Sequence, residues 1–347
     1  MSTCEAGNDF NNAHMGARIS SVFVILITSS AGAFLPILSS KYSFIRMPSW
    51  LFFGAKYFGT GVIVATAFIH LLEPAADNLG EECLGGTFED YPWAFGIALM
   101  SLFTLFFFEL LAFNFIKDKV GAHSHNHFEI SSKENELKDE DEEAEHETEQ
   151  TKKVPDYPDH FRHANSHQDP ESKNTPVDLD KETYYGQLVS TLVLEFGIIF
   201  HSVFVGLTLA ISGEEFQTLY VVIVFHQMFE GLGLGTRIAS TEWPMDKRWL
   251  PFVLALCYGL TTPISIAIGL GVRNSYAPGS RTALITNGVF DAISAGILIY
   301  TGLVELMAHE FLFSDQFKGP DGSKRMMIAF VVVCFGAGVM ALLGRWA

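Results

Sequence analysis

The sequence predicts an all-α membrane protein with eight transmembrane helices, three before and five after one long polar segment. Three observations predict this class. Of the 347 residues, 49% are hydrophobic, and the mean hydropathy is positive at +0.25. The apolar residues come in runs of about 20, the length that a helix needs to cross a bilayer. No alternating pattern of about ten residues indicates a β-barrel, and helices satisfy every backbone amide internally.

Each apolar run is assigned to one transmembrane span, and the span ends where the hydropathy falls. The N-terminal tail, 1–17, is polar and lacks the order of a cleavable signal, so the first run is expected to direct insertion itself. Helices one to three are expected within 18–116 and helices four to eight within 187–346, on either side of a polar loop at 117–186. The expected spans are 18–38, 50–72, 93–116, 187–212, 216–238, 250–272, 283–307 and 326–346.

Charged residues beside the spans predict the orientation. The loop after span two is acidic, with Glu81, Glu82, Glu89 and Asp90, whereas positive residues follow the odd-numbered spans. Because positive loops stay in the cytosol, both termini are expected outside and the long loop inside. Arg273 and Arg281, after span six, run against this pattern. The positive residues that agree with this pattern are Lys41, Arg46, Lys117, Lys119, Arg237, Lys247, Arg248, Lys318, Lys324 and Arg325.

The four cysteines show no metal-finger spacing. Cys4 and Cys83 can pair only if both face an oxidising compartment, and the sequence leaves that pairing open. Cys257 and Cys334 lie in apolar runs and are interpreted as inert packing groups.

The polar loop at 117–186 combines high charge with few aliphatic residues, so it is expected to be disordered. Its alternating His123, His125 and His127 predict a weak metal-binding tract, because imidazoles there are solvated and mostly neutral near pH 7. A solvated linker with incidental histidines is the alternative. Its Ser and Lys side chains are accessible to phosphorylation and ubiquitination.

Ionisable residues inside apolar runs are the main functional signal, because a charge at mid-bilayer costs about 2.5 to 3.5 kcal/mol on insertion scales. His201 and His226 are each about a dozen residues from the turn near Gly213, so an antiparallel hairpin places them at similar depth. Glu230 follows His226 by one helical turn on the same face. Two imidazoles and one carboxylate suit Zn²⁺ or Fe²⁺. For each histidine taken singly, a hydrogen-bonded packing role is the alternative.

Further ionisable residues lie near the ends of spans. His70 and Glu73, at the predicted outer end of span two, are candidates for the point where a cation enters, or simply an interfacial helix end. Glu305, with His309 and Glu310 at the inner end of span seven, has the same two interpretations for the exit. Glu195 and Asp291 can pair with Lys56 or bond Ser and Thr hydroxyls, so they are given mainly structural roles. Glu109, near the inner end of span three, is expected to face polar headgroups.

The segments HSVFVGLTLA, from His201, and HQMFEGLGLG, from His226, together resemble the signature of the ZIP family of zinc- and iron-regulated transporter-like proteins. The resemblance is to the fungal and plant plasma-membrane uptake subfamily, and it covers nearly the whole chain. It implies that His201, His226 and Glu230 hold the transported cation, with Ser202 and Gln227 as auxiliary ligands. It also implies import into the cytosol by alternating access, with one helical bundle sliding against another.

Two positions depart from the pattern of family members that hold two metals. Such members carry a second acid one turn after the span-four histidine, where this chain has Val205, and an acid where it has Gln227. One metal is therefore expected in the core.

The sequence leaves two rival functional classes. An intramembrane zinc hydrolase is disfavoured because HEXXH is absent, and a metal-sensing receptor would bind through 118–182 without conducting. No phosphate loop is present, so a metal gradient and the membrane voltage, about 2.3 kcal/mol per charge per 100 mV, would drive import. The expected partners are the divalent cation and the bilayer, with no nucleic acid and no resident cofactor; the oligomeric state is left open.

Overall fold

The computed structural model describes residues 4, 13–42, 45, 47–131, 176–213, 215–241, 243–273, 279–313, 315–317 and 321–345. Within these ranges all regular structure is helical, which confirms the predicted class. Eight helical stretches are long and apolar enough to cross a membrane, three of them before residue 112 and five after residue 187.

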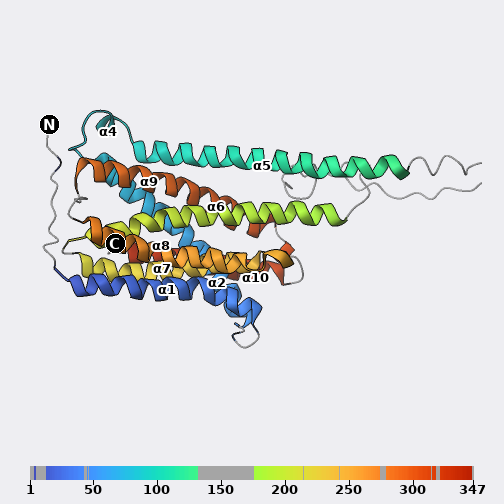
Figure 1. Ribbon diagram of the computed structural model, residues 1–347, viewed down its shortest axis with the longest axis horizontal. Helices are drawn as coiled ribbons and strands as arrows, with labels where there is room; N and C mark the ends of the chain where they lie inside the picture. The colour runs from blue at the N-terminus through green and yellow to red at the C-terminus, as the bar shows by residue number, and fades with distance from the viewer. Residues whose placement is uncertain are drawn as a thin grey trace, which may run out of the picture. The chain divides into compact units, whose positions relative to one another are not determined.

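Some of the spans are single helices and others are runs of consecutive elements, such as α2 with η2 and α3, or α9 with η4 (Figure 1). Their bounds are α1 (Met15–Lys41), α2 (Ser49–Ala65), η2 (Thr66–Leu72), α3 (Glu73–Gly80), α4 (Thr87–Asp90), α5 (Trp93–Ser131), α6 (Pro176–Ile211), α7 (Phe216–Ser240), η3 (Met245–Lys247), α8 (Leu250–Val272), α9 (Arg281–Tyr300), η4 (Thr301–Phe313), η5 (Asp315–Phe317) and α10 (Gly322–Gly344).

The chain divides into two units, and one of them holds every candidate site residue of the spans. That unit comprises 1–108 and 187–347; the other, 109–186, contains the later part of α5 and the beginning of α6. Both helices extend past their predicted ends, so the backbone of His123, His125 and His127 is helical. Residues 132–175 lie outside the described residues, and the disorder expected of the polar loop stays a prediction.

Span two is longer than predicted. It was expected to end at residue 72, but it continues through the π-helical η2 into α3 and ends at Gly80. Pro74 does not stop it, because it lies in the first turn of α3, where a missing N–H is tolerated. His70 therefore lies inside the span, in a π-helical turn of a kind often found at functional sites.

The site-bearing unit contains two groups of helices that pack mainly among themselves. The first group is α1, α6, α7 and α8, joined at one end by an apolar cluster around Ile25, Leu209, Phe216 and Ile266. Within it, α1 and α7 run side by side (Figure 1). The second group is α2, η2, α3, α9, η4 and α10. A central core with residues from both groups holds them together.

A buried arginine anchors the hairpin formed by α6 and α7. Arg18 of α1 donates to the carbonyls of Leu209 and Ala210 at 3.3 and 3.1 Å, so it caps the last turn of α6. Its guanidinium also lies 4.2 Å from the centre of the Phe216 ring, at the start of α7. The hairpin that carries the candidate ligands is thereby held at a fixed position against α1.

A disulfide joins Cys4 to Cys83, which answers the pairing that the sequence left open. Cys257 and Cys334 are free and exposed. Their exposure, on helices expected to lie in lipid, differs from the packing role predicted for them.

Candidate metal centre

Three predicted ligands meet between α6 and α7. The Nε2 atoms of His201 and His226 are 3.5 Å apart, and Nε2 of His226 is 3.7 Å from Oε2 of Glu230. One ligand atom from each residue lies within 4.8 Å of the other two, as coordination of a single ion requires. The predicted depth match between the two histidines is therefore realised.

These groups are buried without the partners that buried polar groups normally have. His201, His226 and Glu230 are 2%, 3% and 0% exposed. Neither carboxylate oxygen of Glu230 has a hydrogen-bond partner among the described residues, nor does Nδ1 of His201. Because an unpartnered buried polar group is costly, the arrangement is better explained as a set of ligands than as a polar packing cluster.

The two predicted auxiliary ligands, Ser202 and Gln227, are also buried. The side-chain polar atoms of Ser202 and Gln227 have no hydrogen-bond partner among the described residues. The main-chain carbonyl of Gln227 accepts a hydrogen bond of 2.5 Å from the hydroxyl of Tyr258, which fixes this turn of α7 against α8. Val205 packs against the apolar cluster around Ile25, so the place of a second acid is filled by an aliphatic side chain.

His70 contacts this site from the second helix group. Its ring lies edge-to-face against the ring of His226, with centroids 4.8 Å apart. Its Nε2 is 3.1 Å from the carbonyl oxygen of Met340 on α10. Glu73, on the next turn, is exposed and is not brought to the histidines. The sequence identified His70 but not this contact, because the contact depends on how two helices far apart in the chain pack together.

Comparison with known proteins decides the family. The family model described as ZIP zinc transporter matches residues 15–344. This chain belongs to the ZIP family of zinc transporters. It is 49% identical to zinc-regulated transporter 2 of Saccharomyces cerevisiae, over 99% of this chain and 97% of that protein. It is 45% identical to zinc-regulated transporter 1 of the same yeast and 32% identical to zinc transporter 3 of Arabidopsis thaliana, over 98% and 99% of this chain and 90% of each relative.

Membership of the ZIP family makes the chain a transporter and not an enzyme, so the hydrolase alternative is set aside. Zinc is accordingly the transported substrate and not a resident cofactor.

A second buried polar cluster of this ZIP protein lies two helical turns after Glu230 on α7. Arg237 donates to Oε1 of Glu310 at 2.8 Å, and its other terminal nitrogen is 4.0 Å from Oε2 of Glu305. Lys56 lies 3.1 Å from the second oxygen of Glu310. We call Lys56, Arg237, Glu305 and Glu310 the ion-pair cluster.

The ion-pair cluster corrects two interpretations of the sequence. Arg237 was taken as a loop charge after span five, but it lies inside α7 and is paired. Its position seven residues after Glu230, on the same helical face, was the signal that could have revealed it. Lys56 was considered as a partner for Asp291 or Glu195, and it pairs with Glu310 instead. His309, beside Glu310, is exposed.

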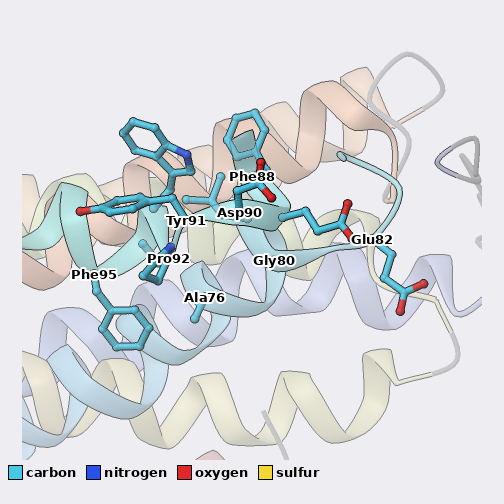
Figure 2. A pocket seen from close by; sticks show the side chains of 12 residues that line it. Ala76, Gly80, Glu82, Phe88, Asp90, Tyr91, Pro92 and Phe95 are labelled. Atoms are coloured by element: carbon cyan, nitrogen blue, oxygen red, sulfur yellow. The ribbon is translucent and has the colours of Figure 1, made fainter. Parts of the chain in front are cut away.

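A cavity of about 320 Å³ lies elsewhere in this ZIP protein, where the end of α3, α4 and the start of α5 meet (Figure 2). Its lining combines aromatic rings with acidic side chains from the loop that carries Cys83. None of the predicted metal ligands lines it. The residues that line it are Ala76, Leu79, Gly80, Glu82, Phe88, Glu89, Asp90, Tyr91, Pro92, Trp93, Ala94 and Phe95.

Proposed function

We propose that this ZIP transporter imports Zn²⁺ into the cytosol through the site formed by His201, His226 and Glu230. The observation that carries the proposal is the meeting of one ligand atom from each of three buried residues within 4.8 Å, with both oxygens of Glu230 lacking a hydrogen-bond partner among the described residues. Ser202 and Gln227 serve as auxiliary oxygen ligands on the same turns. The names of the relatives, zinc-regulated transporters 1 and 2, support zinc as the cargo. Fe²⁺ accepts the same ligand types and is a second candidate cargo.

Transport requires alternating access, because ligands this deeply buried are closed to water on both sides. All three lie on the first helix group, whereas His70 and most of the ion-pair cluster lie on the second. Sliding of one group along the other would present the site to each side in turn. In this scheme His70, with Glu73 beyond it, receives the entering cation, and Glu305 with His309 marks the exit.

We propose a plasma-membrane location with both termini outside. The disulfide between Cys4 and Cys83 supports an oxidising environment at this end of the helices. An even number of spans returns the C-terminus to the same side. The loop at 117–186 would then lie in the cytosol, where His123, His125 and His127 bind metal weakly and phosphorylation or ubiquitination acts. The oligomeric state stays open, with a homodimer as one alternative.

Uptake of radiolabelled Zn²⁺ in cells that lack their own zinc uptake tests the site. Removal of outer-shell partners of a metal ligand typically costs 10- to 100-fold, so His201→Ala or Glu230→Ala should lower uptake per surface molecule by more than about 100-fold. Thr208→Ala, an exposed position on α6, is the matched control and should transport like the parent. Parental transport by both ligand variants would refute the site.

Purified protein in liposomes tests the cargo and the transporter class together. Labelled Zn²⁺ should accumulate in the vesicles with no other protein present, and unlabelled Zn²⁺ should compete. Unlabelled Fe²⁺ that competes equally well would extend the cargo to iron. Deletion of 132–175 should leave basal transport largely intact, whereas a receptor that senses metal through this loop would lose its output.

A further inference from the structure

Glu195 is a buried carboxylate that the proposed transport site does not use. It lies on α6, six residues before His201, and is 3% exposed. Both of its oxygens lack a hydrogen-bond partner among the described residues. Within that part of the chain, one other carboxylate has both oxygens in this state, and it is Glu230. The same physical signature thus marks a candidate metal ligand and Glu195.

Contacts on either side of Glu195 fix its level between α6 and α7. Nearer the turn, His201 meets His226 at 3.5 Å. Further from the turn, the Oγ of Ser190 accepts from Arg237 at 3.3 Å. Because the two helices run antiparallel, Glu195 must lie level with the part of α7 that joins Glu230 to Arg237.

The face of α6 that carries Glu195 is turned toward α7. Thr191, one helical turn earlier on the same face, has its hydroxyl 3.1 Å from the hydroxyl of Thr241. Ser202, two turns later on that face, is buried beside the candidate site. At a rise of about 1.5 Å per residue, Glu195 lies about 9 Å along the axis from His201. A cation leaving Glu230 toward the proposed exit at Glu305 must pass this level.

Glu195 is surrounded by apolar side chains, which makes an unpartnered carboxylate energetically unfavourable there. Its neighbours on α6, Leu194 and Ile198, belong to the apolar core, together with Leu234 and Leu298. A carboxylate buried among such groups is unfavourable in either protonation form unless something binds its oxygens. A purely structural carboxylate has a built-in partner, as Glu310 has in Arg237.

We propose that Glu195 is a transit station for the divalent cation, occupied after the His201, His226 and Glu230 site and before the proposed exit at Glu305 and His309. This inference rests on the proposed function. It assigns Glu195 a ligand of the same chemical class, bound briefly by one carboxylate. A station with fewer ligands than the main site holds the cation more weakly, as onward movement requires.

The test compares binding with transport in purified, reconstituted protein. Glu195→Gln keeps the side-chain volume and removes the anionic ligand, and Glu195→Asp keeps the ligand on a shorter arm. We expect Glu195→Gln to bind Zn²⁺ at equilibrium like the parent and to lose about tenfold in Vmax with little change in KM. Glu195→Asp should recover part of that rate. Glu230→Gln is the reference, because it should lose equilibrium binding as well as transport.

The outcomes separate this inference from the proposed function. If Glu230→Gln binds and transports like the parent, the main site is misassigned and the proposed function fails. If that reference behaves as expected but Glu195→Gln transports at the parental rate, the transit station alone is refuted. Loss of equilibrium Zn²⁺ binding in Glu195→Gln would make Glu195 part of the main site, and an equally slow Glu195→Asp with a lowered melting temperature would make it structural.

Exchange of internal unlabelled for external labelled Zn²⁺ distinguishes a cation station from a group that carries only protons. Exchange moves zinc in both directions without net proton movement. We expect Glu195→Gln to slow exchange as much as net uptake, and parental exchange in this variant would overturn the proposal.

Discussion

The His–Glu site and the ion-pair cluster lie two helical turns apart on α7, and both hold a buried glutamate. Glu310 is 4% exposed and lies between the cationic groups of Arg237 and Lys56. Glu230 is fully buried, and its oxygens have no hydrogen-bond partner among the described residues. The ion-pair cluster therefore contains cationic side chains that pair with its glutamate, whereas the His–Glu site contains no such side chain.

The difference teaches what distinguishes a binding site from a structural pair inside a membrane. Moving charges out of water is costly, and a built-in cation offsets that cost permanently. A carboxylate without one gains from any dication that reaches it, so it suits an exchangeable cargo. By this criterion Glu230 is organised for binding and Glu310 for holding α2, α7 and η4 together.

The largest expected contrast is between the two glutamates. Glu230→Gln should lower zinc uptake by more than about 100-fold and leave the melting temperature nearly unchanged, because it removes a ligand and no ion pair. Glu310→Gln should destabilise the protein by about 3 to 5 kcal/mol, because it leaves Arg237 and Lys56 without their shared partner. Uptake per surface molecule and thermal unfolding in detergent measure the two effects.

A combined variant is the control for that contrast. Arg237→Met and Lys56→Met together with Glu310→Leu remove both cations with the carboxylate that they share and leave only the partly exposed Glu305, so stability should largely return. A lower melting temperature for Glu230→Gln than for Glu310→Gln would contradict the assignment of roles.

The second-largest effect on zinc uptake is expected where the two helix groups contact each other. Gly59 of α2 lies so close to Gly233 of α7 that a Cβ at Gly59 would overlap the Cα of Gly233. Because backbone atoms cannot move aside as a flexible side chain can, Gly59→Ala must push α2 away from the helix that carries Glu230. Uptake should fall at least about tenfold, with the defect in Vmax.

Gly54 provides the matched control on the same helix. A Cβ there meets nothing within 4 Å, so Gly54→Ala should transport normally and gain up to about 1 kcal/mol of helix stability. Equal transport by the two variants would show that the crossing of α2 and α7 places no constraint on movement.

Most of the fold could be predicted from the sequence because membrane spans depend on local composition. The predicted span 250–272 coincides with α8, Leu250–Val272, and 216–238 ends two residues before Ser240. Span two was wrong at its end. The predicted end at residue 72 comes directly before Glu73 and Pro74, whereas the helix passes through a π-helical turn and continues to Gly80.

The metal site could be predicted as far as one hairpin determines it. His201, His226 and Glu230 lie on two consecutive helices, so counting residues from the turn was enough to match their depths. The contact of His70 with His226 depends on how α2 packs against α7, which no local pattern encodes. The pairing of Lys56 with Glu310 joins residues far apart in the chain, and for the same reason it escaped prediction.

External acid should weaken zinc binding at the His–Glu site. Imidazole must be unprotonated to bind zinc, so protons compete with the cation for His201 and His226. In the acid range where one proton must leave for each cation bound, KM for Zn²⁺ should rise by about tenfold per pH unit. Initial uptake rates between pH 5 and 7.5 measure this, and a KM that is flat across the range would argue against histidine ligation.

The smallest expected effect on transport is that of the disulfide. Cys4 and Cys83 are bonded at one end of the helices, far along the chain from every ligand, so Cys4→Ser should change uptake by less than about twofold. The freed thiol of Cys83 should then react in intact cells with a maleimide that cannot cross the membrane. Cys83→Ser, with Cys4 freed, should behave in the same way, while the Cys4→Ser/Cys83→Ser double variant reports any labelling of Cys257 and Cys334. Labelling of Cys83 only after the cells are permeabilised would place this end in the cytosol. That result would reverse the proposed orientation and exchange the sides on which His70 and the ion-pair cluster act.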